Sequence, residues 1–189
     1  MIGGPNGAGK TTLTTGWIAG RIPIINPDDI AQRLPRIGGR LDERSAGVAA
    51  LQERAQRLND RDTFAVETTL SGHSPTSLIR TASALGYKVT LVFIGLADAR
   101  LSIMRVADRV LGGSHDVPID AIVRRYDDAL ASLTLVWGLV DRAYLIDNSG
   151  PRRRLILSKD ADGIRQASCS APLWARIALP LVSWDLEGG

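Results

Sequence analysis

The sequence predicts an α/β fold: a doubly wound parallel sheet with helices on both faces. Two observations predict this fold, and the chain length predicts the number of domains. Apolar segments of strand length alternate with segments of helical periodicity, and the connections between them are short. Residues 88–94 form a continuous, β-branched apolar run that is typical of a central parallel strand. The length of 189 residues, with 44% hydrophobic residues, predicts one domain over residues 1–189.

The first half of the chain shows two strand signals and two helix signals. A glycine-rich segment opens the helical pattern that starts at Lys10, and a short apolar strand follows it. Apolar residues near helical spacing then alternate with charged residues up to Leu58, and a buried strand ends before Glu67. We therefore expect helices over residues 10–19 and 42–58, and strands over residues 22–26 and 63–66.

The second half has clearer boundaries. Ser74 can cap a helix that has Pro75 in its first turn and Gly86 at its end. Two further helical segments flank a glycine-containing loop at 112–118, and apolar runs follow them. We therefore expect helices over residues 74–85, 98–110 and 119–139, and strands over residues 88–94, 143–146 and 154–157. The four tryptophans are widely spaced and are expected to pack in the fold rather than to stack on bases.

The glycine-rich segment matches the phosphate-loop pattern G-x-x-x-x-G-K-[ST] in full, with Gly4, Gly9, Lys10 and Thr11 at the fixed positions. Glycines allow backbone N–H groups to turn toward phosphate oxygens, and the N-terminus of the following helix favours anions. Lys10 would reach the outer phosphates, and the Thr11 hydroxyl would coordinate Mg²⁺. The sequence thus predicts binding of a nucleoside triphosphate with Mg²⁺ by Gly4, Pro5, Asn6, Gly7, Ala8, Gly9, Lys10, Thr11 and Thr12.

Only three residues precede this loop, so the strand that normally leads into it is expected to be very short or the chain to be clipped. Other polar clusters also follow strands, at Asp28, at Glu67 and at residues 147–149. In doubly wound sheets ligands bind at the carboxyl ends of the strands, so we expect these clusters to meet the loop in one crevice.

Other classes of nucleotide-binding protein fit less well. A guanine-reading Asn-Lys-x-Asp motif does not follow a late strand, and the apolar strand 88–94 leads into Gly95 rather than into an acidic residue. Small kinases often take their acids from other strands and their arginines from a mobile lid, which is the pattern found here.

Seven blocks of sequence occur in order at residues 4–12, 25–31, 67–72, 105–110, 115–118, 124–126 and 147–149. Together they resemble the zeta-toxin-like P-loop kinases of bacteria over roughly residues 3–150. The resemblance implies an ATP-dependent kinase for a small molecule, with UDP-N-acetylglucosamine as the acceptor in the toxin branch, and an antitoxin protein as a possible partner. Three positions depart from the family: the short first strand, Ser114 before His115, and Pro27 after Asn26.

We expect Asp28 to accept the proton of the acceptor hydroxyl, the role that the matching residue has in the family, while Asp29 caps the next helix. Glu67 and Thr68 are expected to bind the acceptor; the alternative for this cluster is helix capping. Asn148 is expected to contact the adenine.

A helical lid over about residues 98–130 would bring arginines to the transferred phosphate, because guanidinium groups stabilise the charge that spreads over its oxygens. Arg105 and Arg124 are the first candidates for this catalytic role. Arg109, Arg125 and the lid-loop residue His115 are assigned to substrate; an ordinary solvated helix face is the alternative for any one arginine, and a structural role for His115.

Composition places limits on the partners. A formal net charge of +3 is a mild excess, and the longest basic cluster, residues 152–154, is typical of a solvated surface patch, so a nucleic-acid partner is not expected. One cysteine builds no disulfide framework, and no signal peptide or membrane span is recognised, so a cytoplasmic protein is expected. The alternatives are a kinase for another small acceptor and a nucleotide-binding protein with little turnover, either regulatory or a truncated remnant.

Overall fold

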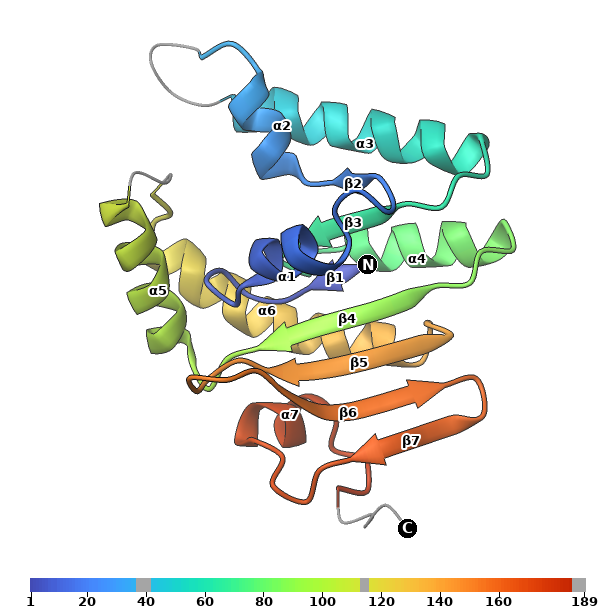
Figure 1. Cartoon of the computed structure of the whole chain (residues 1–189), viewed down its shortest axis with the longest axis vertical. Coiled ribbons are helices and arrows are strands. Elements are labelled where there is room, and N and C mark those ends of the chain that lie inside the picture. The colour runs from blue at the N-terminus through green and yellow to red at the C-terminus, as the bar shows by residue number, and fades with distance from the viewer. Residues whose placement is uncertain (37–41, 113–115, 185–189) are drawn as a thin grey trace. The chain divides into compact units, whose positions relative to one another are not determined.

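The computed structural model describes residues 1–36, 42–112 and 116–184, and in these it contains seven strands and seven helices (Figure 1). The helices are α1 Lys10–Trp17, α2 Pro27–Arg33, α3 Glu43–Asn59, α4 Ser74–Ala84, α5 Ala99–Leu111, α6 Ile119–Trp137 and α7 Leu173–Ala178. The strands are β1 Ile2–Gly3, β2 Ile24–Ile25, β3 Ala65–Thr68, β4 Thr90–Gly95, β5 Arg142–Asp147, β6 Arg154–Asp160 and β7 Gly163–Ala167. The chain divides into two compact units: residues 1–10 with 68–189, and residues 11–67.

The larger unit contains a sheet in the order β1-β4-β5-β6-β7. β1 and β4 are parallel, with Ile2 opposite Val92, and β4 is parallel to β5 along its whole length. β6 and β7 are antiparallel to their neighbours, because only short turns without a helix connect β5 to β6 and β6 to β7. The α/β fold is confirmed, and the sheet is mixed rather than wholly parallel.

One hydrophobic core belongs to this larger unit. It joins one face of the strands to α4, α6 and α7, and its buried residues include Phe93, Leu133 and Trp174. Of the other tryptophans, Trp184 is buried and Trp137 is partly buried against the core, but Trp17 is 68% exposed, contrary to the expectation that all four would pack in the fold. Since α6 contributes several core residues, its second half is a fixed part of the domain.

The smaller unit contains α2, α3 and the parallel strands β2 and β3, in which Ile24 pairs with Ala65. No range was predicted for α2, and the expected cap Asp29 lies in its first turn instead of at its N-cap position. The Asn26 carboxamide caps it by accepting a hydrogen bond from the Asp28 backbone N–H (3.0 Å), and Pro27 lies in its first turn. Asp42 caps α3 in the same way through Ser45.

Candidate phosphate-binding site

The glycine-rich loop connects β1 to α1, the position that the sequence predicts. Gly4, Gly7 and Gly9 have φ values of +145°, +71° and +87°, which other residues rarely adopt. A Cβ atom at Gly4 would lie 2.2 Å from the Ile94 carbonyl oxygen, and one at Gly7 would lie 3.0 Å from Cβ of Arg105. The loop therefore needs glycine at these positions both for its backbone conformation and for the close approach of β4 and α5.

The six carbonyl groups of residues 4–9 all accept hydrogen bonds from side chains. Lys10 Nζ donates to the carbonyls of Gly4 (2.8 Å) and Pro5 (3.0 Å). The other four donors come from distant parts of the larger unit. They are Ser102 Oγ to Asn6, Arg105 Nη1 to Gly7 at 3.5 Å, Asn148 Nδ2 to Ala8 at 2.9 Å and Arg153 Nη2 to Gly9 at 3.4 Å.

This arrangement fits a bound phosphate chain. Donors that engage the carbonyl oxygens fix the orientation of the peptide groups, and successive N–H groups of such a loop form an anion-binding concavity. The buried Oδ1 atom of Asn6 lacks a hydrogen-bond partner among the described residues. Lys10 is held by two carbonyl oxygens, from which its ammonium group can move to a phosphate oxygen.

The residue after Lys10 contributes to a second cluster, within the smaller unit. The Thr11 hydroxyl donates to Glu67 Oε1 (2.7 Å), and the Thr14 hydroxyl lies 3.1 Å from Glu67 Oε2. Glu67 is only 6% exposed, at the end of β3. Because the Thr11 proton is directed to this carboxylate, the hydroxyl oxygen presents its lone pairs to a cation. The pair is thus suited to hold Mg²⁺, with Thr11 as the ligand and Glu67 as its orienting partner.

The remaining described candidates lie on helices α1, α2, α5 and α6 and at the end of strand β3. Asp28 lies in the first turn of α2 with an exposed side chain, and the Thr68 hydroxyl accepts from the Leu70 backbone N–H (3.1 Å). Arg109 and Arg124 are exposed on α5 and α6, and Arg125 is half-buried. His115 lies outside the described residues. Thr12 is exposed in the first turn of α1.

The structure brings Arg105 and Asn148 to the loop, but as donors to its carbonyls. The sequence analysis missed Ser102, Arg153 and Thr14. Only Thr14 had a local signal, because it lies one helical turn after Thr11 and so shares its helix face. Ser102 and Arg153 lie 96 and 144 residues from their loop partners, and no local pattern reports such contacts.

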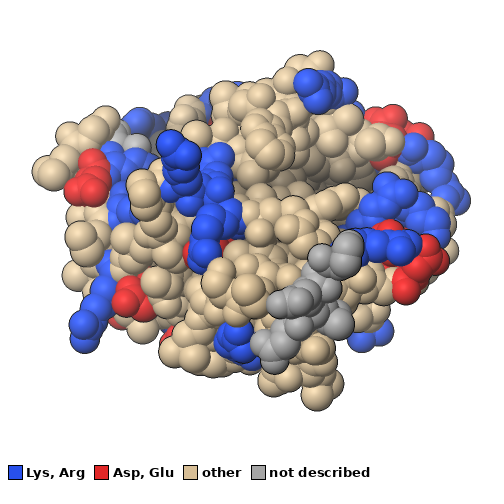
Figure 2. All heavy atoms as spheres, turned by 60° about the horizontal axis from the view of Figure 1, so that its bottom comes forward, with Lys and Arg blue, Asp and Glu red and all other residues tan. Residues whose placement is uncertain are grey.

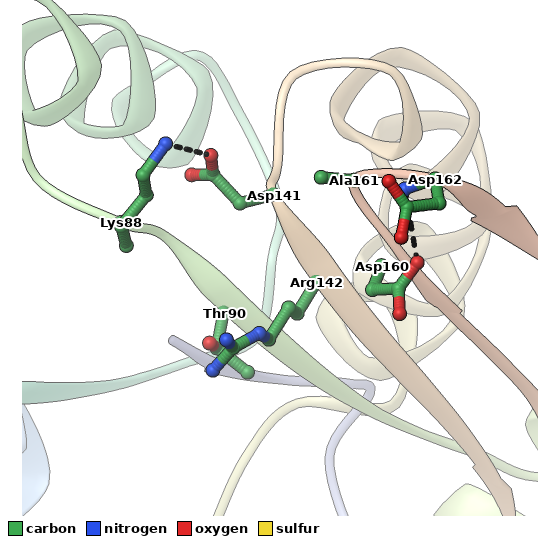
Figure 3. Close-up of a pocket in the computed structure, with 7 residues that line it drawn as sticks. All are labelled: Lys88, Thr90, Asp141, Arg142, Asp160, Ala161 and Asp162. Atoms are coloured by element: carbon green, nitrogen blue, oxygen red, sulfur yellow. Dashed lines mark hydrogen bonds and ion pairs between the residues drawn. The ribbon is translucent and has the colours of Figure 1, made fainter.

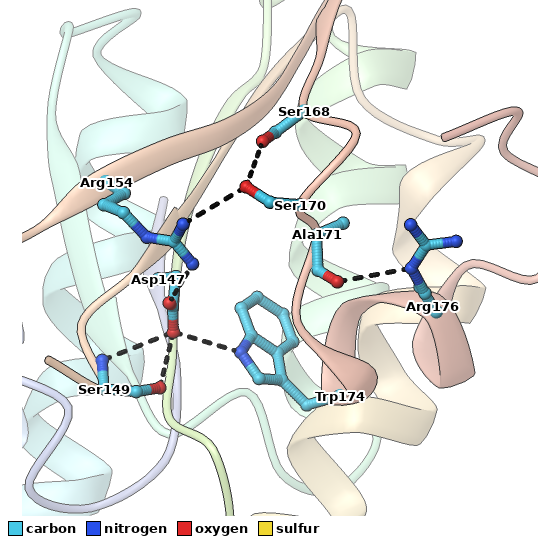
Figure 4. Close-up of polar contacts among 8 residues, drawn as sticks. All are labelled: Asp147, Ser149, Arg154, Ser168, Ser170, Ala171, Trp174 and Arg176. Atoms are coloured by element: carbon cyan, nitrogen blue, oxygen red, sulfur yellow. Dashed lines mark hydrogen bonds and ion pairs between the residues drawn. The ribbon is translucent and has the colours of Figure 1, made fainter. Parts of the chain in front are cut away.

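Behind the loop, the larger unit contains a buried polar network centred on Asp147, at the end of β5 (Figure 4). Its Oδ1 accepts from Ser149 and from Trp174 Nε1 (3.3 Å), and its Oδ2 accepts from Arg154 Nη2 (3.0 Å). Burial acts to raise the pKa of Asp147, but these hydrogen bonds outweigh it and hold the pKa below its ordinary value. The network fixes the start of the β5–β6 turn, which carries Asn148 and Arg153.

A pocket of about 250 Å³ lies at the opposite ends of β4 and β5 from the loop (Figure 3). Four of its charged side chains form ion pairs: Lys88 with Asp141 at 3.1 Å, and Asp160 and Asp162 with Arg165. None of the described residues that line the pocket contributes a hydrogen bond to the phosphate loop.

The surface charge and the hydropathy of the helices bear on which partners the protein can bind. On the face shown in Figure 2, the described basic side chains form separate groups among acidic ones rather than one continuous basic surface. Within residues 1–36, 42–112 and 116–184, no helix is both long and apolar enough to cross a bilayer.

A loop of this sequence and shape between a strand and a helix of an α/β sheet defines the P-loop class of proteins. No protein-family model matches the chain. An uncharacterized protein of Haemophilus influenzae is 31% identical over 123 residues, which are 65% of this chain and 88% of that protein. The chain therefore belongs to the same family as this Haemophilus protein.

Solved structures confirm the fold expected from the resemblance to zeta-toxin-like kinases. A chain of the AvrRxo1-ORF1:-ORF2 complex with ATP matches all of this chain with a TM-score of 0.72 and 16% identity, and this chain spans 64% of its length. A chain of the PezAT chromosomal toxin-antitoxin system of Streptococcus pneumoniae matches 98% of this chain and 78% of its own length, with a TM-score of 0.63 and 18% identity. A candidate kinase from Chloroflexus aurantiacus matches 66% of this chain and 74% of its own length, with a TM-score of 0.51 and 18% identity.

Proposed function

We propose that the protein is an ATP-dependent kinase of the zeta-toxin type, which transfers the γ-phosphate of ATP to a hydroxyl of a small acceptor such as UDP-N-acetylglucosamine. The observation that carries the proposal is the phosphate loop, in which side chains donate hydrogen bonds to all six carbonyl groups of residues 4–9. Two of these hydrogen bonds come from Lys10. Similarity in fold to a chain solved with ATP supports the choice of nucleotide.

The chemistry would be an in-line displacement. The acceptor oxygen forms a bond to the γ-phosphorus, the bond to the β,γ-bridging oxygen breaks, and ADP leaves. Asp28 takes the proton of the hydroxyl, and Glu67 and Thr68 bind the acceptor. Mg²⁺, held by Thr11 and the nucleotide, would neutralise charge on the phosphates.

Arginines supply the remaining positive charge. Arg105 and Arg124 are assigned to the transferred phosphate, and Arg109, Arg125 and His115 to the substrate. Arg105 also donates to the carbonyl of Gly7 at 3.5 Å, which supports a place beside the phosphates. Because two of the similar solved chains come from a complex of two proteins and from a toxin-antitoxin system, an antitoxin partner is part of the proposal.

The test is turnover of ATP with UDP-N-acetylglucosamine by the wild type, Lys10→Ala, Asp28→Asn and Asp29→Asn. Asp29 is the matched control, because it is an equally exposed carboxylate one residue further along α2. We expect a phosphorylated sugar nucleotide from the wild type and Asp29→Asn, and a loss of at least about 100-fold in Asp28→Asn. ATP binding without product for any acceptor in a panel would instead indicate a nucleotide-binding protein with little turnover.

A further inference from the structure

The three arginines at residues 152–154 have different surroundings, although the sequence suggests a single solvated patch. Arg154 forms an ion pair with Asp147 at 3.0 Å. Arg153 reaches the phosphate loop, where its Nη2 atom lies 3.4 Å from the carbonyl oxygen of Gly9. Arg152 is exposed, and no contact between it and the loop is found among the described residues. The cluster thus contains one arginine that is placed at the phosphate loop.

Arg153 lies against the last glycine of the loop. A Cβ atom added to Gly9 would lie 3.0 Å from Asn148 Nδ2 and 3.3 Å from Arg153 Nη2, so these two side chains cover this glycine. Gly9 directly precedes Lys10, the residue expected to bind the outer phosphates. The guanidinium group therefore lies beside the part of the loop where phosphate charge is expected.

The turn that carries Arg153 is fixed at both ends. Asp147 and Arg154 are opposite each other in the antiparallel β5–β6 ladder, and their side chains form the ion pair. Within the turn, Asn148 donates to the carbonyl of Ala8 at 2.9 Å. Fixed ends restrict where Arg153 can move, and a restricted side chain loses less conformational entropy when it binds a ligand.

The hydrogen bond to the Gly9 carbonyl oxygen uses only one of the N–H donors of Arg153. An arginine has five N–H donors in a planar fork that matches phosphate oxygens, and its side chain here is exposed. We infer that Arg153 is a nucleotide-binding residue: its guanidinium group bridges the carbonyl of Gly9 and a phosphate oxygen of a nucleoside triphosphate bound in the loop. The inference rests on the nucleotide binding in the proposed function, and does not depend on the identity of the acceptor.

The experiment is titration of a fluorescent ATP analogue into the wild type, Arg153→Gln, Arg153→Lys and Arg152→Gln, followed by displacement with inorganic tripolyphosphate. Arg152→Gln is the matched control, because it removes the same charge from the neighbouring position. We expect Arg153→Gln to weaken binding of the analogue and of tripolyphosphate by about tenfold, as for loss of one charge-assisted hydrogen bond. The affinity of Arg153→Lys should lie between those of Arg153→Gln and the wild type, and Arg152→Gln should bind both ligands as the wild type does.

Equal affinities of Arg153→Gln and Arg152→Gln for the analogue would overturn the inference and leave the proposed function standing. A loss for the analogue without a loss for tripolyphosphate would also overturn it, because the contact would then be to the nucleoside. A wild type that binds neither ligand would refute the proposed function itself. Thermal unfolding of each variant identifies a folding defect, and Arg153→Lys, which keeps the charge and most of the side chain, then decides the question.

Discussion

Replacement of Asp147 by asparagine should destabilise the larger unit. Asp147 is 5% exposed, and every hydrogen bond that its carboxylate accepts comes from a donor that stays in place after the substitution. An asparagine offers one acceptor oxygen and one NH₂ group. Whichever way the amide is turned, its NH₂ group faces either Arg154 or the pair Ser149 and Trp174, so at least one donor loses its partner.

The magnitude follows from these contacts. A buried donor left without an acceptor costs about 1–3 kcal/mol. The ion pair with Arg154 adds less than about 1 kcal/mol, because the Arg154 side chain is 49% exposed and solvent screens the pair. Together these terms predict that the free energy of unfolding falls by about 1–4 kcal/mol.

Urea unfolding of Asp147→Asn and the wild type, followed by tryptophan fluorescence at pH 7 and at pH 3, measures this change. Since the folded-state pKa of Asp147 lies below its ordinary value, the stabilisation is fully present above about pH 4. It is lost as the pH falls through the folded-state pKa, so the difference between the two proteins should shrink toward pH 3.

A difference that is below about 1 kcal/mol at pH 7, or that is equally large at both pH values, would refute the reasoning. Asp162→Asn is the matched control. The side chain of Asp162 is 80% exposed, so loss of its ion pair with Arg165 should change stability by less than about 1 kcal/mol.

Two further variants test the loop and the cation site. Gly7→Ala should weaken ATP binding at least about tenfold, because φ is +71° and the new methyl group would contact α5. Gly16→Ala is the control and should bind ATP as the wild type does, because the space around Gly16 is open. Equal affinities of the two variants in an ATP titration would contradict this. Glu67→Gln turns the partner of Thr11 and Thr14 into an amide, so the Mg²⁺ concentration for half-maximal turnover should rise about 10–100-fold. An unchanged Mg²⁺ dependence would show that Glu67 does not orient the ligand.

Sequence patterns identified most of the fold, since most of its elements have local signals. The run at residues 88–94 became β4, and the proline and glycine signals around residues 74–86 bounded α4. Three elements were missed: α2, β7 and the six-residue helix α7. β7 is an exposed edge strand with little apolar alternation, and the Asn-Pro-Asp-Asp start of α2 combines a cap with a first-turn proline but was interpreted mainly as a catalytic cluster.

For the site, the sequence identified the loop because its pattern is contiguous and requires glycine, lysine and threonine or serine at fixed positions. It did not predict what holds the loop. Arg105 is predicted to act on the transferred phosphate and Asn148 on adenine; the contacts that the structure adds are the hydrogen bonds from each side chain to a loop carbonyl. These contacts join residues 98 and 140 positions apart, so they depend on the packing of α5 and β5 rather than on any spacing in the chain.

The close packing of Trp174 over Gly95 limits how the protein can vary in evolution. A Cβ atom at Gly95 would lie 2.3 Å from a ring carbon of Trp174. The same indole lies with its ring centroid 5.7 Å from that of Phe93, at an interplanar angle of 42°, and its N–H group donates to Asp147. A larger residue at position 95 is therefore compatible only with a smaller one at position 174. Homologous sequences should show these two positions changing together, and the helix α7 should be retained wherever glycine ends β4.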